Sequence, residues 1–239
     1  IDIHGGGRDL IFPHHENEIA QSCCAYGGNF VNHWMHNATV DIDGEKMSKS
    51  LGNIRTVRDL LKNYRGDVLK LALLSTHYRS PLNFSTALLE QSEKTLTSFY
   101  NSLREVDEIP IDEVNIADTS FYAALCDDLN TPLAISELHS MTKRINTGSS
   151  SEKRSAKSEL LAAGSLLGLL DCEPNTWLQG GLDLISISPE EIESLILERD
   201  KAKKAKNYAR ADEIRGLLTS KGVLLEDSND GTRWRRSSD

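Results

Sequence analysis

Apolar and polar positions along the chain follow one pattern before about residue 55 and another after it. At the start, Ile1 to Ile3 predicts the end of a strand that runs into a glycine-rich turn, His4 to Gly7. A helical pattern then extends from His14 to about Tyr26, where two glycines provide a helix stop. Large and β-branched residues from Val31 to Val40 predict a second strand. The order strand, glycine turn, helix, strand is typical of an open α/β sheet.

After residue 55, helical periodicity dominates. Thr56 to Asp59 fits a capping box at the start of a helix. An apolar seam at helix spacing follows, made of Leu96, Phe99, Leu103 and Val106. Further along, Thr131 is predicted to cap a helix with Pro132 at its first position. The small residues from Thr147 to Ser151 predict a loop between two helices.

The last part of the chain changes pattern again. Residues from Pro174 to Ser188 predict a linker, and Ser188-Pro189-Glu190-Glu191 begins a new helix with acidic residues in its first turn. A strand pattern from Val223 to Leu225 precedes a polar turn, Ser228 to Gly231, which would reverse the chain into Thr232 to Trp234. A helix followed by a strand hairpin is therefore expected here.

Composition indicates an ordinary globular protein. The 239 residues suffice for one large domain or two or three small ones. The longest apolar runs are too short to span a membrane, and the first residues do not resemble a signal peptide. Four cysteines, two of them adjacent, do not make a disulfide framework in a chain of this size. We therefore expect a cytoplasmic protein with no membrane partner.

The charge is unevenly distributed. A formal net charge of −9 argues against nucleic-acid binding, but distribution matters more than the sum. Between Arg199 and Arg210 six basic residues stand against only Asp200, and the end of the chain adds Arg233, Arg235 and Arg236. A locally basic end suits a module that contacts phosphates. For a charge run alone, a solvated helix face is the more common explanation, and that alternative stays open.

A possible metal site lies near the start. On a helix, His14 and Glu18 lie on one face about one turn apart and can hold one ion. Without context, a surface ion pair is the more common role of such a pair. Cys23 would point to the opposite side of the helix, and Cys24 would lie about 9 Å beyond Glu18 along the axis. Neither can complete a tetrahedral site, so we expect both cysteines to pack in the core.

Two hydrolase interpretations fail. His4-Gly5-Gly6-Gly7 resembles an oxyanion-hole motif of esterases, but the chain has no Gly-x-Ser-x-Gly elbow. His15-Glu16 lacks the second histidine of a His-Glu-x-x-His metalloprotease. A glycine-rich segment where a strand meets a turn lets a ligand approach the backbone closely.

Four motifs in order resemble the cysteinyl-tRNA synthetase family: His4 to Glu18, Lys46 to Ser50, Asp127 to Pro132, and Asp227 to Trp234. The resemblance extends over essentially the whole chain. The segment ending at Glu18 is the most specific, whereas Lys-Met-Ser-Lys-Ser alone would indicate only a class I aminoacyl-tRNA synthetase.

The resemblance implies a fold in three parts. These are an α/β remnant of a class I synthetase Rossmann-type catalytic domain, a mostly α-helical bundle, and a small α+β anticodon-binding domain. The expected boundaries are 1–55 for the second half of the catalytic domain with the Lys46 to Ser50 loop, 56–110 for a helical stem-contact region, 111–173 for the bundle, and 189–239 for the anticodon-binding domain.

The resemblance also implies a zinc site. In the family, the positions of His14 and Glu18 join two cysteine thiolates to bind zinc, which takes the thiolate of the substrate cysteine. Zinc favours a soft thiolate over a hydroxyl, so serine would be rejected at the first step. The two cysteine ligands would lie upstream of Ile1.

Further roles follow from the resemblance. Lys49 would contact the ATP phosphates as pyrophosphate leaves, a role that suits a flexible cation in a polar loop, with Lys46 and Ser48 shaping that loop. A solvated basic turn is the alternative for this loop. The residues expected to bind nucleotide are His4, Gly6 and Asp9. Those expected to contact the anticodon are Tyr208, Asp212, Arg215 and Asp227, by stacking and by hydrogen bonds to base edges. We expect Trp234 to lie in a core.

The implied reaction is ATP-dependent activation of cysteine on zinc, with magnesium-bound ATP, followed by transfer to tRNA-Cys by a monomer. A His-x-Gly-His signature is not found and the chain begins abruptly, which predicts a carboxy-terminal fragment that is inactive alone. Two alternatives stay open. One is a non-catalytic tRNA-binding synthetase fragment. The other is a cysteine:amino-sugar ligase relative, which would lack the anticodon module.

Overall fold

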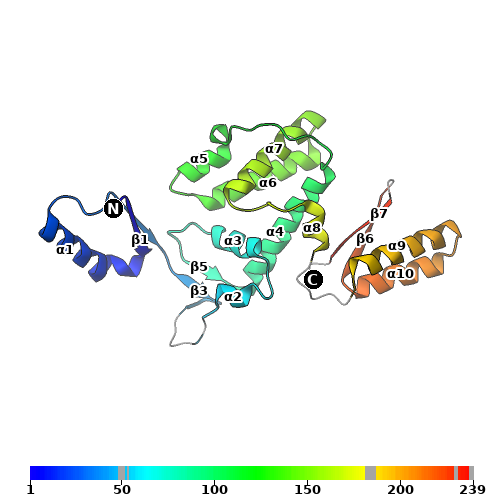
Figure 1. Cartoon of the computed structure of the whole chain (residues 1–239), viewed down its shortest axis with the longest axis horizontal. Coiled ribbons are helices and arrows are strands. Elements are labelled where there is room, and N and C mark those ends of the chain that lie inside the picture. Colours follow the sequence, from blue (N-terminus) through cyan, green and yellow to red (C-terminus); the bar gives the residue numbers. More distant parts are fainter. Residues whose placement is uncertain (48–51, 53, 181–186, 229–230, 237–239) are drawn as a thin grey trace.

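The computed structural model describes residues 1–47, 52, 54–180, 187–228 and 231–236, without the side chains of Lys46 and Ser228. Its elements form three groups along an elongated molecule (Figure 1). An α/β part at one end and a small module at the other are joined through helices around α4 (Thr86–Glu105). None of the helices in the described ranges has both the length and the apolar content needed to cross a bilayer.

The predicted strand–helix–strand unit is present at the start and is called here the amino-terminal unit. β1 (Ile3–Gly7) pairs in parallel with β2 (His33–Asn37), and α1 (Glu16–Tyr26) lies between them in sequence. The predicted glycine turn is wrong, because the glycines themselves belong to the sheet, with Gly7 opposite Asn37. Gly6 is required for space, since a Cβ there would lie 2.9 Å from the ring of His15.

A second, mixed sheet follows. β3 (Val40–Ile42) pairs in parallel with β5 (Leu82–Phe84) and antiparallel with β4 (Glu45–Lys46). The predicted strand region from Val31 to Val40 is therefore divided between two sheets. Asp43 and Gly44 have φ values of 51° and 88° and make the tight turn between β3 and β4, a conformation that Asp-Gly adopts readily.

Two short helices lead from this sheet to the middle of the chain. The first, α2 (Val57–Leu60), begins at the predicted cap, where the amide of Asp59 donates to Oγ1 of Thr56 over 3.1 Å. The second, α3 (Gly66–Leu74), is rich in apolar residues and contributes four buried side chains to the main core. Packing against α4 is what makes so short a helix stable.

The middle of the chain forms a helical bundle. Besides α4, it contains α5 (Ser120–Cys126), α6 (Thr131–Thr147), α7 (Ser150–Leu166), α8 (Pro174–Gln179) and a short turn of helix at Ile116–Asp118. The four residues of the predicted seam on α4 are at most 2% exposed, which confirms their place in the core. The cap of α6 is Asn130 and not Thr131, because the Asn130 side chain accepts from the amide of Leu133.

Part of the predicted linker is a structural helix. In α8, Trp177 and Leu178 are buried, and the indole of Trp177 stacks on Tyr100 with ring centroids 4.7 Å apart. The guanidinium of Arg65 lies 4.2 Å from the ring centroid of Trp177 and donates to its carbonyl oxygen. The linker prediction is therefore wrong for residues 174–179, because two large apolar side chains anchor a polar stretch.

A buried lysine fixes the end of α4. Lys157 of α7 donates from its ammonium to the carbonyl oxygens of Val106, Asp107 and Ile109, at 3.0, 2.8 and 2.8 Å. Carbonyl groups at a helix end have no intrahelical partner and carry partial negative charge. The ammonium satisfies three carbonyls at or just beyond this end, which explains why a lysine that is only 6% exposed is tolerated in the core.

The end of the chain forms a separate small unit, called here the terminal module. It contains α9 (Pro189–Lys204), α10 (Tyr208–Ser220), β6 (Val223–Ser228) and β7 (Gly231–Arg236), with the two strands antiparallel. Its core is made of Ile187, Ile192, Ile196, Ile214, Leu218, Val223 and Trp234. The predicted helix start, the hairpin and the core position of Trp234 are confirmed; the turn residues 229 and 230 lie outside the described residues.

Candidate metal centre and terminal module

Two histidines contact one carboxylate in the amino-terminal unit. Nε2 of His4, on β1, lies 3.1 Å from Oε2 of Glu18, and Nε2 of His14 lies 3.5 Å from Oε1 of the same residue. The predicted proximity of His14 and Glu18 is thus confirmed. A metal-sized group is formed by His4, His15 and Glu18, whose ligand atoms lie within 4.8 Å of one another.

The carboxylate of Glu18 fits a cation better than a structural ion pair. Among the described residues its Oε2 is buried and accepts no hydrogen bond, despite the nearby ring of His4. A buried carboxylate oxygen without a donor is costly. Imidazole and carboxylate groups together form a donor set that zinc accepts. The geometry therefore favours a metal at Glu18.

His15 was not singled out by the sequence. It is 3% exposed, and its Nδ1 lies 2.8 Å from Nε2 of His36 on β2. Burial, and then the neighbouring His4, lower the pKa of His15 below its ordinary value. An imidazole kept neutral retains the lone pair that a metal needs. Its position between Gly6 and β2 could have been found only from the pairing of the two strands.

Aromatic rings line the same site. The ring of Trp34 lies 4.8 Å from that of His4 and is nearly parallel to that of His36. Asp9 is exposed, and its carboxylate lies against the position that a Cβ of Gly7 would take. The segment predicted to bind nucleotide therefore lies against aromatic rings, with those of His4 and Trp34 tilted by 47° to each other. Whether His4, Gly6 and Asp9 contact a nucleotide stays a prediction.

The cysteines of α1 do not join the site. Sγ of Cys23 donates to the carbonyl oxygen of Gly28 over 3.3 Å, and Cys24 is exposed. The prediction that they pack in the core is wrong, because α1 buries none of its residues. Their exclusion from the metal site by helix geometry agrees with the positions observed.

The lysine loop is described only in part. The backbone of Lys46 belongs to β4 and pairs with Asp41. Ser48 and Lys49 lie outside the described residues, so their predicted roles remain predictions.

The residues predicted to contact an anticodon behave in two different ways. Tyr208, Asp212 and Arg215 are exposed along α10, with Tyr208 63% exposed, at spacings that place them along one side of the helix. Asp227, by contrast, accepts from both terminal nitrogens of Arg199 at 2.8 Å and also from Thr232 and Lys203. These donors, above all Arg199, hold the pKa of Asp227 far below its usual range.

The basic run is partly internal to the fold. Arg199 is 3% exposed and pairs with Asp227, while Arg210 pairs with Glu198 and Glu213. Lys203 also contacts Asp227. The exposed members of the run are Lys201, Lys204 and Lys206. About half of the charge that suggested phosphate binding therefore stabilises the terminal module itself.

Three protein-family models match the chain. They are described as the tRNA synthetases class I (C) catalytic domain at residues 1–94, the DALR domain at residues 120–171, and the cysteinyl-tRNA ligase anticodon binding domain at residues 188–235. Together they cover most of the chain in the order in which the parts of the fold occur.

Curated relatives agree with these matches. A cysteine--tRNA ligase of Saccharophagus degradans is 56% identical over 99% of this chain and 52% of its own length. One of Rhodospirillum rubrum is 48% identical, with the same coverage of both chains. The chain thus spans about half the length of the curated relatives it matches.

A solved structure supports the fold. A complex of LeuRS, tRNA and LeuAMS from Agrobacterium radiobacter K84 superimposes with a TM-score of 0.51 over 94% of this chain and 36% of that one. The two sequences are 16% identical, so this likeness concerns the fold alone. It confirms the predicted class of fold, an α/β remnant followed by helices.

Proposed function

Because the chain belongs to the cysteinyl-tRNA synthetase family, we propose that it carries the metal-binding and RNA-binding parts of an enzyme that activates cysteine with ATP and transfers it to tRNA-Cys. The observation that carries this proposal is the carboxylate of Glu18, whose buried Oε2 lies beside His4 and accepts no hydrogen bond from the described residues, while its Oε1 lies beside His14. We expect the protein to act in the cytoplasm as a monomer.

The metal proposed for this site is zinc. Glu18 and His14 would hold the ion, and His4, whose Nε2 faces Oε2 of Glu18, would orient the carboxylate. When bound, zinc supplies a ligand position that prefers a thiolate to a hydroxyl, and this preference separates cysteine from serine. The ring of His15 contacts His36 and packs against Gly6. This packing would hold in place β1, the strand on which His4 lies.

The nucleotide is proposed to bind beside the metal. The ring of Trp34 would stack on adenine beside His4, and Gly6 would contribute its backbone. Lys49 would meet the phosphates of magnesium-bound ATP, and Lys46 and Ser48 would shape the loop that presents it. These residues bind and neutralise charge and take no part in proton transfer.

The terminal module is proposed to recognise the anticodon. Exposed Tyr208 would stack on an unpaired base, while Asp212 and Arg215 would form hydrogen bonds with base edges. Asp227 would act indirectly, because its carboxylate already holds α9 against the hairpin through Arg199. The exposed Lys201 and Lys204 would contact phosphates.

The test uses the chain together with the half of a relative that it does not span. Mixed with the first half of the Saccharophagus degradans ligase, the chain should support cysteine-dependent ATP–pyrophosphate exchange, and alone it should not. Glu18→Gln should abolish bound zinc, measured by elemental analysis, and the exchange. Glu113→Gln, which removes an exposed carboxylate between α4 and α5, serves as the control. Exchange that proceeds equally well with serine would refute the proposal.

The same experiment distinguishes two alternative functions from the proposed one. A non-catalytic tRNA-binding synthetase fragment would bind tRNA but show no exchange in the mixture. A cysteine:amino-sugar ligase relative would not need an anticodon-binding domain, and the match at residues 188–235 weighs against it.

A further inference from the structure

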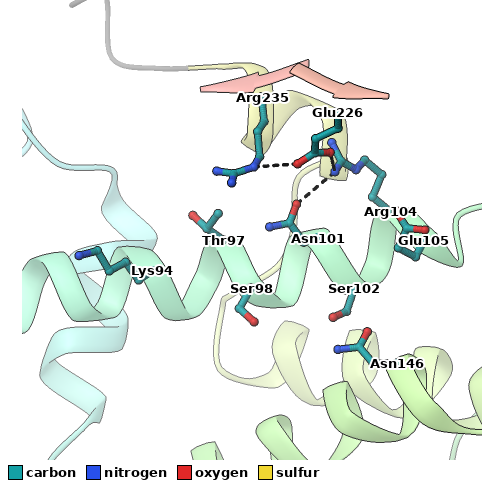
Figure 2. Close-up of a pocket in the computed structure, with 10 residues that line it drawn as sticks. All are labelled: Lys94, Thr97, Ser98, Asn101, Ser102, Arg104, Glu105, Asn146, Glu226 and Arg235. Atoms are coloured by element: carbon teal, nitrogen blue, oxygen red, sulfur yellow. Dashed lines mark hydrogen bonds and ion pairs between the residues drawn. The ribbon is translucent and has the colours of Figure 1, made fainter. Parts of the chain in front are cut away.

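Charged side chains tie the helical bundle to the parts of the chain on either side of it. At the junction with the terminal module, Nη2 of Arg104 on α4 donates to Glu226 over 2.5 Å, and Nε of Arg235 donates to the same carboxylate over 2.8 Å (Figure 2). On the side of the α/β part, the carboxylate of Asp128, in the turn between α5 and α6, contacts the segment that leads into β5. Each contact therefore joins segments that are far apart in the sequence.

Two neighbouring residues donate to the carboxylate of Asp128. The hydroxyl of Tyr78 donates to its Oδ1 over 2.6 Å, and Nε of Arg79 lies 2.8 Å from its Oδ2. Nε of Arg79 also donates to the Tyr78 hydroxyl over 2.8 Å. The hydrogen bond from Tyr78, and then those from Arg79, hold the pKa of Asp128 below its usual range. The three side chains thus form one network around a charged carboxylate.

The backbone that presents Asp128 is in an uncommon conformation. Asp128 and Leu129 have φ values of 51° and 55°, in the left-handed region. Aspartate enters this region more readily than other residues, but leucine rarely does. Leu129 is 46% exposed, so burial of its side chain does not explain the turn. Such conformations persist where the surroundings enforce them and are common at functional positions. The contact that the turn makes is that of Asp128 with Tyr78.

The backbone of Tyr78 holds the end of the amino-terminal unit. Its carbonyl oxygen accepts from the amide of Ala38 over 2.8 Å, and Ala38 is the residue that directly follows β2. Among the described residues, the elements of the amino-terminal unit pack mainly against one another. His36, whose ring contacts His15 of the metal-sized group, lies two residues before Ala38 on this chain segment. The position of Tyr78 therefore affects the strand that supports the metal centre.

We propose that Asp128 is a positioning residue for the reaction of the proposed function. Through Tyr78 and Arg79 it holds the Tyr78 carbonyl against the amide of Ala38. It thereby sets the metal centre relative to β3 and β4, where the lysine loop begins. A misplacement of reacting groups by about 1 Å can lower a rate about 100-fold although every group is still present. The inference rests on the proposed function for the reaction, whereas the placement of the amino-terminal unit can be measured without it.

The kinetic experiment uses the mixture with the first half of the Saccharophagus degradans ligase. Asp128→Asn keeps a residue that tolerates the left-handed region and removes the charge, and Tyr78→Phe removes only the hydroxyl. Each should lower kcat of cysteine-dependent ATP–pyrophosphate exchange about 10-fold. KM for cysteine and bound zinc should not change, because the proposed metal ligands lie within the amino-terminal unit. The double variant should be no slower than either single one, since both changes break the same network.

The structural experiment measures hydrogen exchange of the chain alone. In Asp128→Asn and Tyr78→Phe the amide of Ala38 should lose protection, while α6 and α7 keep theirs. Asp127→Asn removes the neighbouring exposed carboxylate and is the matched control, with no change expected in kcat or in protection.

Two results would overturn the inference. One is an Asp128→Asn variant with the kcat and the Ala38 protection of the Asp127→Asn control. The other is an equal loss of protection throughout the bundle, which would mean that Asp128 stabilises the bundle and does not position the metal centre. If the unchanged mixture shows no exchange, the proposed function fails, and the protection of Ala38 alone then decides whether Asp128 sets the position of the amino-terminal unit.

Discussion

The amino-terminal unit and the terminal module are both built from a two-stranded sheet and helices, but they bury their residues differently. In residues 1–37, all of which are described, Val31 is the one buried apolar side chain, while Ile3, Phe12 and Tyr26 are 65%, 77% and 91% exposed. The terminal module buries a full set of apolar residues around Trp234. Exposed apolar surface on this scale is typical of an interface.

The comparison teaches where each unit obtains its stability. The terminal module holds Tyr208, Asp212 and Arg215, the residues proposed to contact RNA, on a self-contained core. The amino-terminal unit holds His4 and Glu18 on a framework with little core of its own, so the packing that fixes its site must come from a further surface. We expect the first half of a relative to supply that surface in the mixture described above.

The largest effect is expected from Trp234→Ala. Trp234 is 2% exposed, and its Nε1 donates to Oε1 of Glu193 over 2.7 Å. The change should destabilise the terminal module by about 3–5 kcal/mol. Hydrogen exchange should show loss of protection in α9, α10 and the strands, with the bundle unaffected. Protection that is lost equally in all three parts would mean that the module is not self-contained.

A smaller loss of stability is expected from Asp227→Asn, because the buried charge of Arg199 then lacks its main partner. Breaking such a pair costs several kcal/mol when both groups are buried. Because the carboxylate of Asp227 is 45% exposed, we expect about 2 kcal/mol. Urea unfolding of the chain measures this loss of stability, with Asp200→Asn, next to Arg199 on α9, as the control.

The pH dependence follows from the lowered pKa of Asp227. In the unfolded chain this carboxyl has a pKa of about 3.9, and in the fold it is lower. The contribution of Asp227 to the free energy of unfolding is therefore complete above about pH 4. It is lost as the pH falls below that value toward the pKa of the folded state. Thermal unfolding at pH 7 and pH 3 should show a smaller difference for Asp227→Asn than for the unchanged chain. Equal differences would mean that the pair is not formed in solution.

Glu226→Gln is expected to loosen the junction and leave both neighbouring cores intact. Arg104 and Arg235 lose their shared anion, and we expect a loss of about 1 kcal/mol in the docking of the terminal module. Small-angle scattering should report a broader range of separations between module and bundle. Glu213→Gln, on the outer side of α10, is the control. If the core of the terminal module also became less stable, Glu226 would act within the module and not only at its junction with the bundle.

The smallest effects on stability are expected at two exposed tyrosines. Tyr208→Ala and Tyr26→Ala should each change stability by less than about 0.5 kcal/mol. Only Tyr208→Ala should weaken tRNA binding, by about 1–3 kcal/mol if one base stacks on the ring. Binding titrations of the two variants provide the comparison.

Much of the fold follows from local signals in the sequence. The seam on α4, the cap at Thr56 and the hairpin at the end were all predicted, because helix periodicity, capping and strand alternation act over a few residues. His14 and Glu18 are close, as their spacing of four predicts, although His14 lies in the π-helical turn Ile11–His15 that precedes α1. Each of these features depends on residues that are near one another in the chain.

What could not be predicted depends on contacts between distant segments. His15 belongs to the site only because β1 pairs with β2 and brings His36 to it. The segment at Trp177 becomes a helix because Tyr100 and Arg65 enclose the indole. The ion pair between Arg199 and Asp227 could not be predicted either, because it forms only when α9 packs against the hairpin. Arg199 therefore stabilises the terminal module.

The contacts of the Lys157 ammonium have a consequence for how the parts of the molecule are held relative to one another. By gathering three carbonyl groups at the end of α4, it ties the helix that bears Arg104 to α7, a partner fifty residues later in the chain. Arg104, which pairs with Glu226 of the terminal module, lies next to this end of α4, so the position of the module depends on a contact within the bundle. A substitution of Lys157 would therefore shift the terminal module relative to the bundle without changing a residue of the module itself.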